Sequence, residues 1–188
     1  MLKLVEPSVK YEEEALAYIM ELLKYNSSIN GTGSLEKYVL DSKYDEWLEL
    51  NEKLKKGPVG DYVPSSTYFL IENSSNKIIG MVNIRHYLND FLLNRGGNIG
   101  YSVRPLERCK GYGKVILYLA LLECQKLNLS KVLITCDDTN IASSKVIEAL
   151  GGILENKISD DDEIVRRYWI DVLDSLNKNK KIYEEVIK

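Results

Sequence analysis

Two glycines and three basic side chains stand together in the segment 108–114, which reads Arg-Cys-Lys-Gly-Tyr-Gly-Lys. The segment follows residues 98–103, which are typical of a β-strand, and precedes a long apolar stretch typical of a helix. A strand, a glycine-containing turn and a helix N-terminus let main-chain N–H groups converge on phosphate oxygens, and the helix dipole adds positive partial charge there. Gly111 and Gly113 carry no β-carbon that would hold a ligand away from the backbone. The segment therefore predicts a site for a phosphate-bearing ligand.

Two nucleotide-binding motifs do not fit this segment. A Walker loop, Gly-x-x-x-x-Gly-Lys-Ser/Thr, would need glycine at position 108 and a hydroxyl residue at position 115, which are Arg108 and Val115. The dinucleotide motif Gly-x-Gly-x-x-Gly would need its third glycine at Ile116. What remains is Arg-x-x-Gly-x-Gly after a strand.

A second pattern lies downstream. Residues 131–135 are short, apolar and β-branched, which predicts a buried strand. Thr139 or Asn140 can then cap a helix that ends at Leu150, with Gly151 after its last turn.

Together the two patterns resemble those of the GNAT (general N-acetyltransferase) superfamily, and the resemblance extends from about residue 66 to residue 170. The family signature is Gln/Arg-x-x-Gly-x-Gly/Ala, followed downstream by a strand, an Asn, a small residue and a short helix closed by Gly. The matching residues are Arg108, Gly111 and Gly113 in the first pattern and Asn140, Ser143 and Gly151 in the second. The segments 63–68, 82–86 and 167–170 resemble more closely a subgroup of predicted bacterial acetyltransferases.

The resemblance implies an α/β (α+β) fold in a single domain, with a mixed, twisted β-sheet of about six to seven strands and helices on both faces. We expect the GNAT-like acetyltransferase domain to span residues 1–172 and residues 173–188 to form a C-terminal extension. Apolar spacing and turn residues give the individual elements. They are strands at 2–6, 67–72, 78–87, 98–103 and 131–135, helices at 11–25, 35–54 and 182–187, a polar loop at 88–97, and a hairpin of 153–158 and 164–172 across a turn at 159–162.

The resemblance also implies acetyl-CoA as co-substrate. In the family, the backbone of the central strand pairs with the pantetheine arm like an added strand, the glycine loop holds the pyrophosphate, and the Asn and small residue downstream contact the pantetheine. The alternatives are a plain tight turn for the glycines and a simple helix cap for Asn140. The implied cofactor-binding residues are Tyr101, Ser102, Val103, Arg108, Cys109, Lys110, Gly111, Tyr112, Gly113, Lys114, Asn140 and Ser143.

The catalytic residues are less clearly marked. Many family members carry a Tyr acid seven residues after the Asn, a position that Ile147 holds here, and some carry a Glu where this chain has Asn98. We therefore name His86, Tyr101 and Asn98 as catalytic candidates, with Tyr87 near the same strand ends. His86 is the single histidine, and its near-neutral reference pKa suits a base, although a lone histidine is more often structural.

Composition limits the other functional classes. The 188 residues are 45% hydrophobic and 28% charged, which is typical of a soluble globular domain. A net charge of −3 gives no electrostatic case for binding nucleic acid or an anionic membrane. No apolar run approaches the roughly 18 residues of a membrane span. Three cysteines without metal-ligand spacing favour reduced thiols in a cytoplasmic protein and predict no metal.

The expected function is acetyl-CoA-dependent N-acetyl transfer to a primary amine by direct attack on the thioester. The acceptor can be a small-molecule amine or a protein amine. Acidic residues in 12–14 and 45–52 could favour a cationic acceptor, or could simply form solvated helix faces. The alternative is a CoA-binding sensor or interaction module of the same fold that catalyses nothing. The long apolar helix and terminal hairpin leave a homodimer open.

Overall fold

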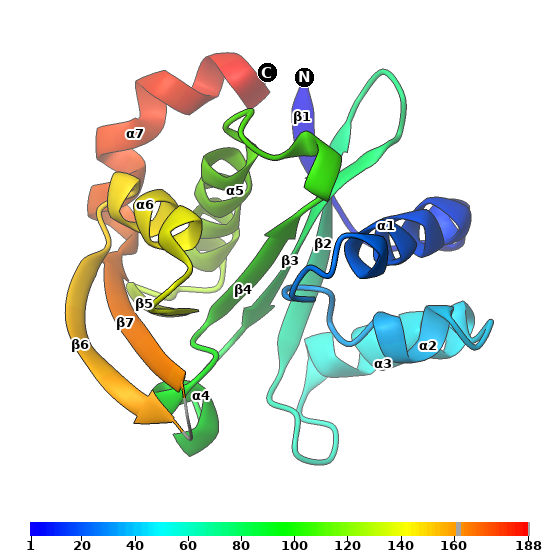
Figure 1. Ribbon diagram of the computed structural model, residues 1–188, viewed down its shortest axis with the longest axis horizontal. Coiled ribbons are helices and arrows are strands. Elements are labelled where there is room, and N and C mark those ends of the chain that lie inside the picture. The colour runs from blue at the N-terminus through cyan, green and yellow to red at the C-terminus, as the bar shows by residue number, and fades with distance from the viewer. Residues whose placement is uncertain (161–162, 188) are drawn as a thin grey trace.

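The computed structural model describes residues 1–160 and 163–187 (Figure 1). In chain order the elements are β1 (Leu2–Val5), a 3-10 turn (Val9–Tyr11), α1 (Glu12–Lys24), α2 (Glu36–Val39), α3 (Tyr44–Lys56), β2 (Ser65–Glu72), β3 (Ile78–Arg85), α4 (Asp90–Asn94), β4 (Ile99–Val103), a 3-10 turn (Pro105–Glu107), α5 (Tyr112–Lys126), β5 (Lys131–Asp137), α6 (Ile141–Ala149), β6 (Ile153–Asp160), β7 (Glu163–Asp171) and α7 (Val172–Ile187).

The strands form two sheets rather than one continuous sheet. The first has the order β1-β2-β3-β4 and the second the order β5-β7-β6, and every pairing within them is antiparallel. The expected α/β fold with six to seven strands is therefore confirmed, with the strands divided four and three. Of the predicted turn at 159–162, residues 161 and 162 lie outside the described residues.

The two sheets meet beside one buried asparagine, Asn98, at the start of β4. Its main-chain N–H donates to the carbonyl oxygen of Leu133 on β5 at 2.7 Å, and its side-chain Oδ1 accepts from the N–H of Leu133 at 2.9 Å. Its Nδ2 donates to the carbonyl oxygen of Arg85 on β3 at 3.2 Å. Beyond this joint no strand pairing joins β4 to β5 in the described residues, and we call the stretch where the two strands run unpaired the opening. In Figure 1, α5 and α6 lie above these two strands.

Helices cover both faces, as the resemblance implies. The strictly apolar side of α5 packs against the first sheet on one face, in a core that continues to β5, α6 and α7. On the opposite face, α1, α2 and α3 enclose a second core around Trp47, which stacks on Phe69 with ring centroids 6.0 Å apart. Aromatic burial of this kind supplies much of the free energy that fixes α3 to β2. Among the helices of the described residues, none combines the length and apolar character needed to cross a membrane.

The structure differs from the sequence-based expectation in the N-terminal half. The single helix expected at 35–54 is two helices, α2 and α3, because the backbone between them turns at Ser42, whose φ is +58°. The polar segment 88–97 contains the short helix α4, which starts where the Asn89 side chain accepts from the N–H of Leu92 at 2.9 Å. An asparagine N-cap is a recognisable signal, but five helical residues are too few to show periodicity.

The C-terminal helix is also longer than expected. Instead of a short helix at 182–187, α7 spans Val172–Ile187. The Tyr183 ring stacks on Tyr118 of α5 at 4.6 Å between centroids, and Ser175 Oγ donates to the carbonyl oxygen of Leu150 at 2.6 Å. The helix is thus packed along its length, and the boundary at residue 172 stays a prediction.

Candidate active site

The edge of β4 that faces β5 carries unpaired main-chain groups. The N–H of Arg85 donates to Asn98 O, and the N–H of Arg104 donates to Ile79 O, at the two ends of the β3–β4 ladder. Because hydrogen-bonded residues alternate along an antiparallel strand, Gly100 and Ser102 pair with β3, while residues 99, 101 and 103 direct their N–H and C=O groups toward the opening. An extended ligand can add to this edge like a strand.

Because of this alternation, the three strand residues that were expected to bind pantetheine do not all direct their main-chain groups to the same side. The main chain of Tyr101 stands opposite Val82 in a non-hydrogen-bonded pair, so its N–H and C=O face the opening and bond to no described residue. Val103 also faces it, but its carbonyl oxygen accepts from Arg108 Nε at 3.2 Å. Ser102 differs from the expectation: its main chain pairs with β3, and its Oγ donates to the carbonyl oxygen of Asn30 at 2.5 Å and contacts Tyr18 OH at 3.0 Å. Ser102 therefore holds the loop after α1 instead of facing the opening.

The loop before α5 presents a row of free main-chain donors. Cys109 and Gly111 have left-handed backbones, with φ of +63° and +87°, and such residues turn successive N–H groups toward one side. In the described part of the chain, no acceptor is bonded to the N–H groups of residues 109–113. Gly113 is needed for packing as well, because a β-carbon there would stand 3.2 Å from Val146 of α6. The loop thus has the geometry of an anion site at a helix N-terminus.

The side chains of the loop play different parts. The Arg108 guanidinium is turned back, since its Nη2 donates to Ser27 Oγ at 2.9 Å and its Nε to β4. Lys110 pairs with Glu107 at 2.7 Å, and Lys77 pairs with the same carboxylate at 2.5 Å. Lys114 forms no ion pair with any described residue, so its ammonium group is available to a ligand. Arg108 and Lys110 therefore fix the loop, and the main chain supplies the donors.

The N-terminus of α6 approaches the opening from the other side. Asn140 caps this helix, with its Oδ1 accepting from the N–H of Ser143 at 3.0 Å, so the predicted capping role is confirmed. Ser143 Oγ lies 3.2 Å from the hydroxyl of Tyr101, which links α6 to β4. Burial raises the pKa of Tyr101 to about 12, so its hydroxyl keeps its proton at neutral pH. A protonated, partly buried phenol beside the opening can act as an acid.

The other catalytic candidates lie elsewhere. His86 follows β3 on the α5 side of the sheet, and its Nε2 is 2.9 Å from Ser66 Oγ. Burial lowers the pKa of His86, so the ring is neutral at pH 7 and able to accept a proton. Both ends of the Asn98 amide are engaged in the joint between the sheets. Ile147, at the family's tyrosine position, is fully buried in the core of α6. The catalytic roles of His86 and Asn98 stay predictions.

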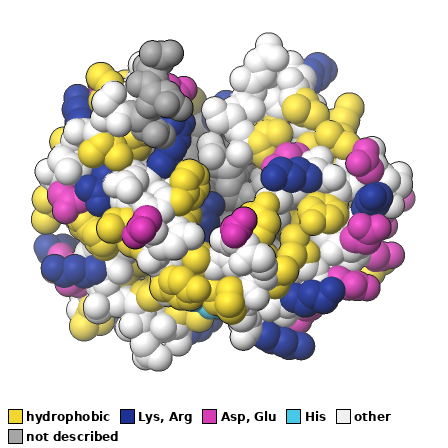
Figure 2. All heavy atoms as spheres, turned by 90° about the horizontal axis from the view of Figure 1, so that it is seen from below, with side chains coloured by type: hydrophobic (Ala, Val, Ile, Leu, Met, Phe, Trp, Pro, Cys, Tyr) yellow, Lys and Arg dark blue, Asp and Glu magenta, His cyan; other side chains and the backbone are white. Residues whose placement is uncertain are grey.

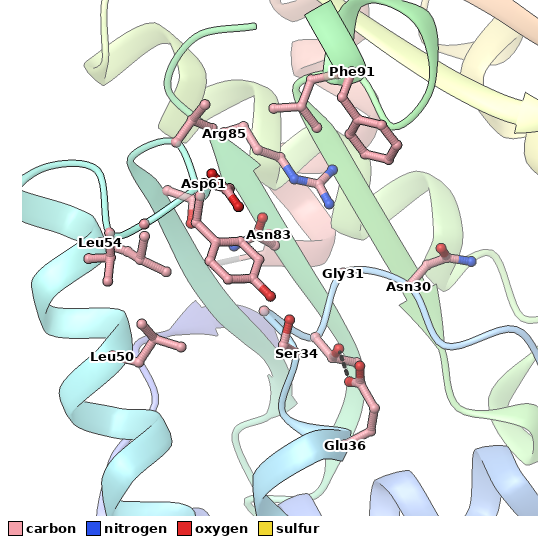
Figure 3. A pocket seen from close by; sticks show the side chains of 18 of the residues that line it. Asn30, Gly31, Ser34, Glu36, Leu50, Leu54, Asp61, Asn83, Arg85 and Phe91 are labelled. Carbon is pink, nitrogen blue, oxygen red and sulfur yellow. Dashed lines mark hydrogen bonds between the residues drawn. The ribbon is translucent and has the colours of Figure 1, made fainter. Parts of the chain in front are cut away.

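A large cavity lies on the opposite face of the first sheet, between the loop after α1, α3 and the ends of β2 and β3. Its volume is about 890 Å³. Figure 2 views the molecule from the end that carries α4, where the surface is hollowed between its two halves. Figure 3 shows Asn83 and Arg85 of β3 pointing into the cavity, with Glu36 at its other end. Sequence reasoning missed these residues, although Asn83 and Arg85 alternate with apolar neighbours in a way that marks one face of the strand.

Gly31 connects this cavity to β4. It lines the cavity, and a β-carbon on it would stand 2.4 Å from the carbonyl oxygen of Gly100 and 2.6 Å from the Cα of Tyr101. Only a residue without a side chain allows the loop to lie this close to the strand. The loop at Gly31 therefore forms part of the cavity wall, and β4 lies directly behind it.

The comparison with family models decides the classification. A model of the acetyltransferase (GNAT) domain matches residues 15–153, which is most of the chain. The chain belongs to the GNAT acetyltransferase family. Membership supports acetyl transfer as the general activity. No protein with curated annotation matches the chain.

Solved GNAT structures share the fold at low sequence identity. The ribosomal-protein-S5-alanine acetyltransferase from Vibrio fischeri superimposes with a TM-score of 0.66 at 15% identity, covering 90% of this chain and 93% of its own. A chimera of spermidine N-acetyltransferase SpeG from Vibrio cholerae and hSSAT gives 0.63 at 17% identity, covering 94% and 98%. A GNAT-family acetyltransferase from Bacillus anthracis gives 0.60 at 16% identity, covering 92% and 95%. At these identities the likeness shows the fold alone.

Proposed function

We propose that this protein is an N-acetyltransferase that uses acetyl-CoA and acetylates a primary amine by direct attack on the thioester. The proposal rests on the main-chain N–H groups of residues 109–113, which donate to no acceptor in the described residues. They lie at the N-terminus of α5, beside the open edge of β4. A diphosphate has acceptor oxygens for such a row, and an amide-containing arm such as pantetheine has groups that pair with a strand edge. Coenzyme A contains both parts in one molecule.

In this proposal the chain acts mainly by positioning. The strand edge at Tyr101 holds the thioester against the end of the cavity that receives the amine, and orientation of this kind removes much of the barrier. The neutral amine attacks the thioester carbonyl carbon, a C–N bond forms, and the C–S bond breaks. The sulfur takes a proton from the Tyr101 hydroxyl, and the proton that the nitrogen loses returns to Tyr101 through solvent. The products are an N-acetylated amine and free CoA.

A second function is favoured by one observation. The family's usual tyrosine acid is replaced by Ile147, whose side chain is fully buried. A domain that binds CoA without turning it over would need the anion loop and the strand edge but no acid. The two functions differ in whether thiol is released in the presence of an amine.

The test of cofactor binding uses a matched pair of glycine variants. Gly111 and Gly151 have nearly the same left-handed φ, +87° and +83°, and a β-carbon would meet no atom within 4 Å at either position. Alanine therefore strains both backbones alike, but only Gly111→Ala disturbs the anion loop. By calorimetry, we expect acetyl-CoA to bind the wild type and Gly151→Ala equally, and to bind Gly111→Ala about tenfold more weakly, the equivalent of about 1.4 kcal/mol.

The outcomes separate the hypotheses. No heat of binding to the wild type would refute the proposal, and equal weakening in both variants would remove the loop from the site. If acetyl-CoA binds but no amine in a broad library releases thiol, the protein is a CoA-binding module.

A further inference from the structure

Among the described residues that line the cavity, one side chain is positively charged. Arg85 enters it from the end of β3, while its acidic side chains are Glu36 and Asp61. The carboxylate of Glu36 accepts from Thr32 Oγ1 at 2.7 Å. None of the acidic residues in 12–14 and 45–52 lines this cavity, so the sequence-based argument for a cationic acceptor does not apply to it.

The charge of Arg85 has no counter-charge among the residues that the structure describes. No carboxylate of residues 1–160 or 163–187 lies within ion-pair distance of its guanidinium. Nη1 donates to the carbonyl oxygen of Gly96 at 3.2 Å, which leaves the other N–H groups of the fork without a partner in the described residues. Burial lowers the pKa of Arg85 to about 10, so the group is charged at neutral pH.

A partly buried, unpaired guanidinium is costly to the fold. Such charges are normally paired, because removing them from water costs more than packing returns. An uncharged Gln or Met would fill the same space without the free-energy cost of removing a charge from water. The presence of a charged side chain here therefore points to a ligand that pairs with it. An arginine fork matches a carboxylate through two parallel hydrogen bonds.

Arg85 also stands close to the reacting strand. The guanidinium nitrogens lie over Gly100, where a β-carbon would be 2.9 Å from Nη1 and 3.3 Å from Nη2. Gly100 directly precedes Tyr101, whose main chain forms the edge that faces the opening. An anion on Arg85 therefore lies within a few bonds of an amine that reaches this edge.

The rest of the cavity suits an apolar body. Aliphatic and aromatic side chains from four segments line it, namely Ile29, Leu50, Leu54, Val63, Phe91 and Leu92. Phe91 is largely exposed at the rim, with 67% of its surface accessible. A cavity with apolar walls and a few polar groups at fixed places is typical of small-molecule sites.

We infer that the acceptor is an amine of the amino-acid type, with a carboxylate close to the amine and an apolar side chain, and that Arg85 binds the carboxylate. This inference rests on the proposed acetyl transfer for its reaction, but carboxylate binding can be measured without it. Arg85 is a specificity-determining residue in this scheme and takes no part in the bond-making step.

The test compares amines that differ only in the carboxylate. Phenylalanine and leucine are paired with phenethylamine and isoamylamine, and thiol release from acetyl-CoA gives kcat/KM for each. We expect each amino acid to exceed its decarboxylated partner at least tenfold. Arg85→Gln should remove this preference, Arg85→Lys should restore part of it, and Lys53→Gln, which changes an exposed cation on α3, should leave it intact.

A second measurement keeps the inference separate from the proposed function. Thermal shift with phenylalanine or leucine alone should stabilise the wild type but not Arg85→Gln, whereas calorimetry should give both proteins the same affinity for acetyl-CoA. Failure of acetyl-CoA to bind, with phenylalanine still stabilising only the wild type, would refute the proposed function and leave the carboxylate site standing. Decarboxylated amines that react as well as the amino acids, or amino acids that neither bind nor react, would overturn the inference.

Discussion

Replacing Asn98 with alanine should destabilise the protein at the joint between its two sheets. The Asn98 side chain accepts from the buried N–H of Leu133 at 2.9 Å and donates to the carbonyl oxygen of Arg85 at 3.2 Å, and only 3% of the residue is exposed. A buried donor left without an acceptor costs about 1–3 kcal/mol, and the second hydrogen bond is worth about 0.5–1.5 kcal/mol. The expected loss in the free energy of unfolding is therefore about 1.5–4.5 kcal/mol.

Urea unfolding measures this loss, and a second asparagine provides the control. Asn94→Ala removes an exposed hydrogen bond from Nδ2 to the carbonyl oxygen of Asp90, 2.9 Å long, and should cost no more than about 0.5 kcal/mol. Amide exchange at Leu133 should accelerate in Asn98→Ala by more than the global destabilisation explains. A loss below about 1 kcal/mol, or exchange at Leu133 that follows global unfolding alone, would refute the role of Asn98 as the joint.

Two further predictions concern single side chains. Tyr101→Phe should lower kcat by about 10²–10⁴-fold without changing acetyl-CoA affinity, because the phenol is the proposed acid; Ser143→Ala keeps that phenol and should cost far less in the same thiol-release assay. Lys110 and Lys77 hold the pKa of Glu107 below its ordinary value of 4.5, so its contribution to stability is present above that value and is lost as pH falls through the folded pKa. Urea midpoints between pH 7 and pH 3 should therefore fall less steeply for Glu107→Gln, and identical slopes would argue against the linkage.

The sequence predicted best those features that depend on residues close together in the chain. The strand, glycine loop and helix around Gly111 are adjacent in the chain, so their residue types predict both the elements and the left-handed turn. The Asn140 cap is equally local, because capping depends on a residue three positions away. Family resemblance supplied the overall fold, which periodicity alone could not, since an eight-residue apolar run in 115–122 fits a strand or a helix.

The parts that sequence reasoning missed depend on contacts between distant segments. Gly31 carries no sequence signal of its own contact, since the structure places it against Gly100, 69 positions further along the chain. Arg85 has an ordinary place at a strand end, and the absence of a carboxylate partner for it within the described part of the chain is a property of three-dimensional packing. The same holds for β4, because its register with β3 determines which of its residues are hydrogen-bonded to that strand. This register directs the main-chain N–H and C=O groups of Tyr101, and not those of Ser102, toward the opening.

The two sheets are joined by the hydrogen bond between the main chains of Asn98 and Leu133. Over most of their length they are separate hydrogen-bonded units. Their relative positions rest on α5, which packs against both halves, and on α7, which touches β1 as well as β7. A ligand arm lying along β4 would supply the missing inter-sheet ladder. The empty protein should therefore melt over a broad interval, with β6 and β7 losing protection before β2 and β3, and the loaded protein should melt sharply as one cooperative block.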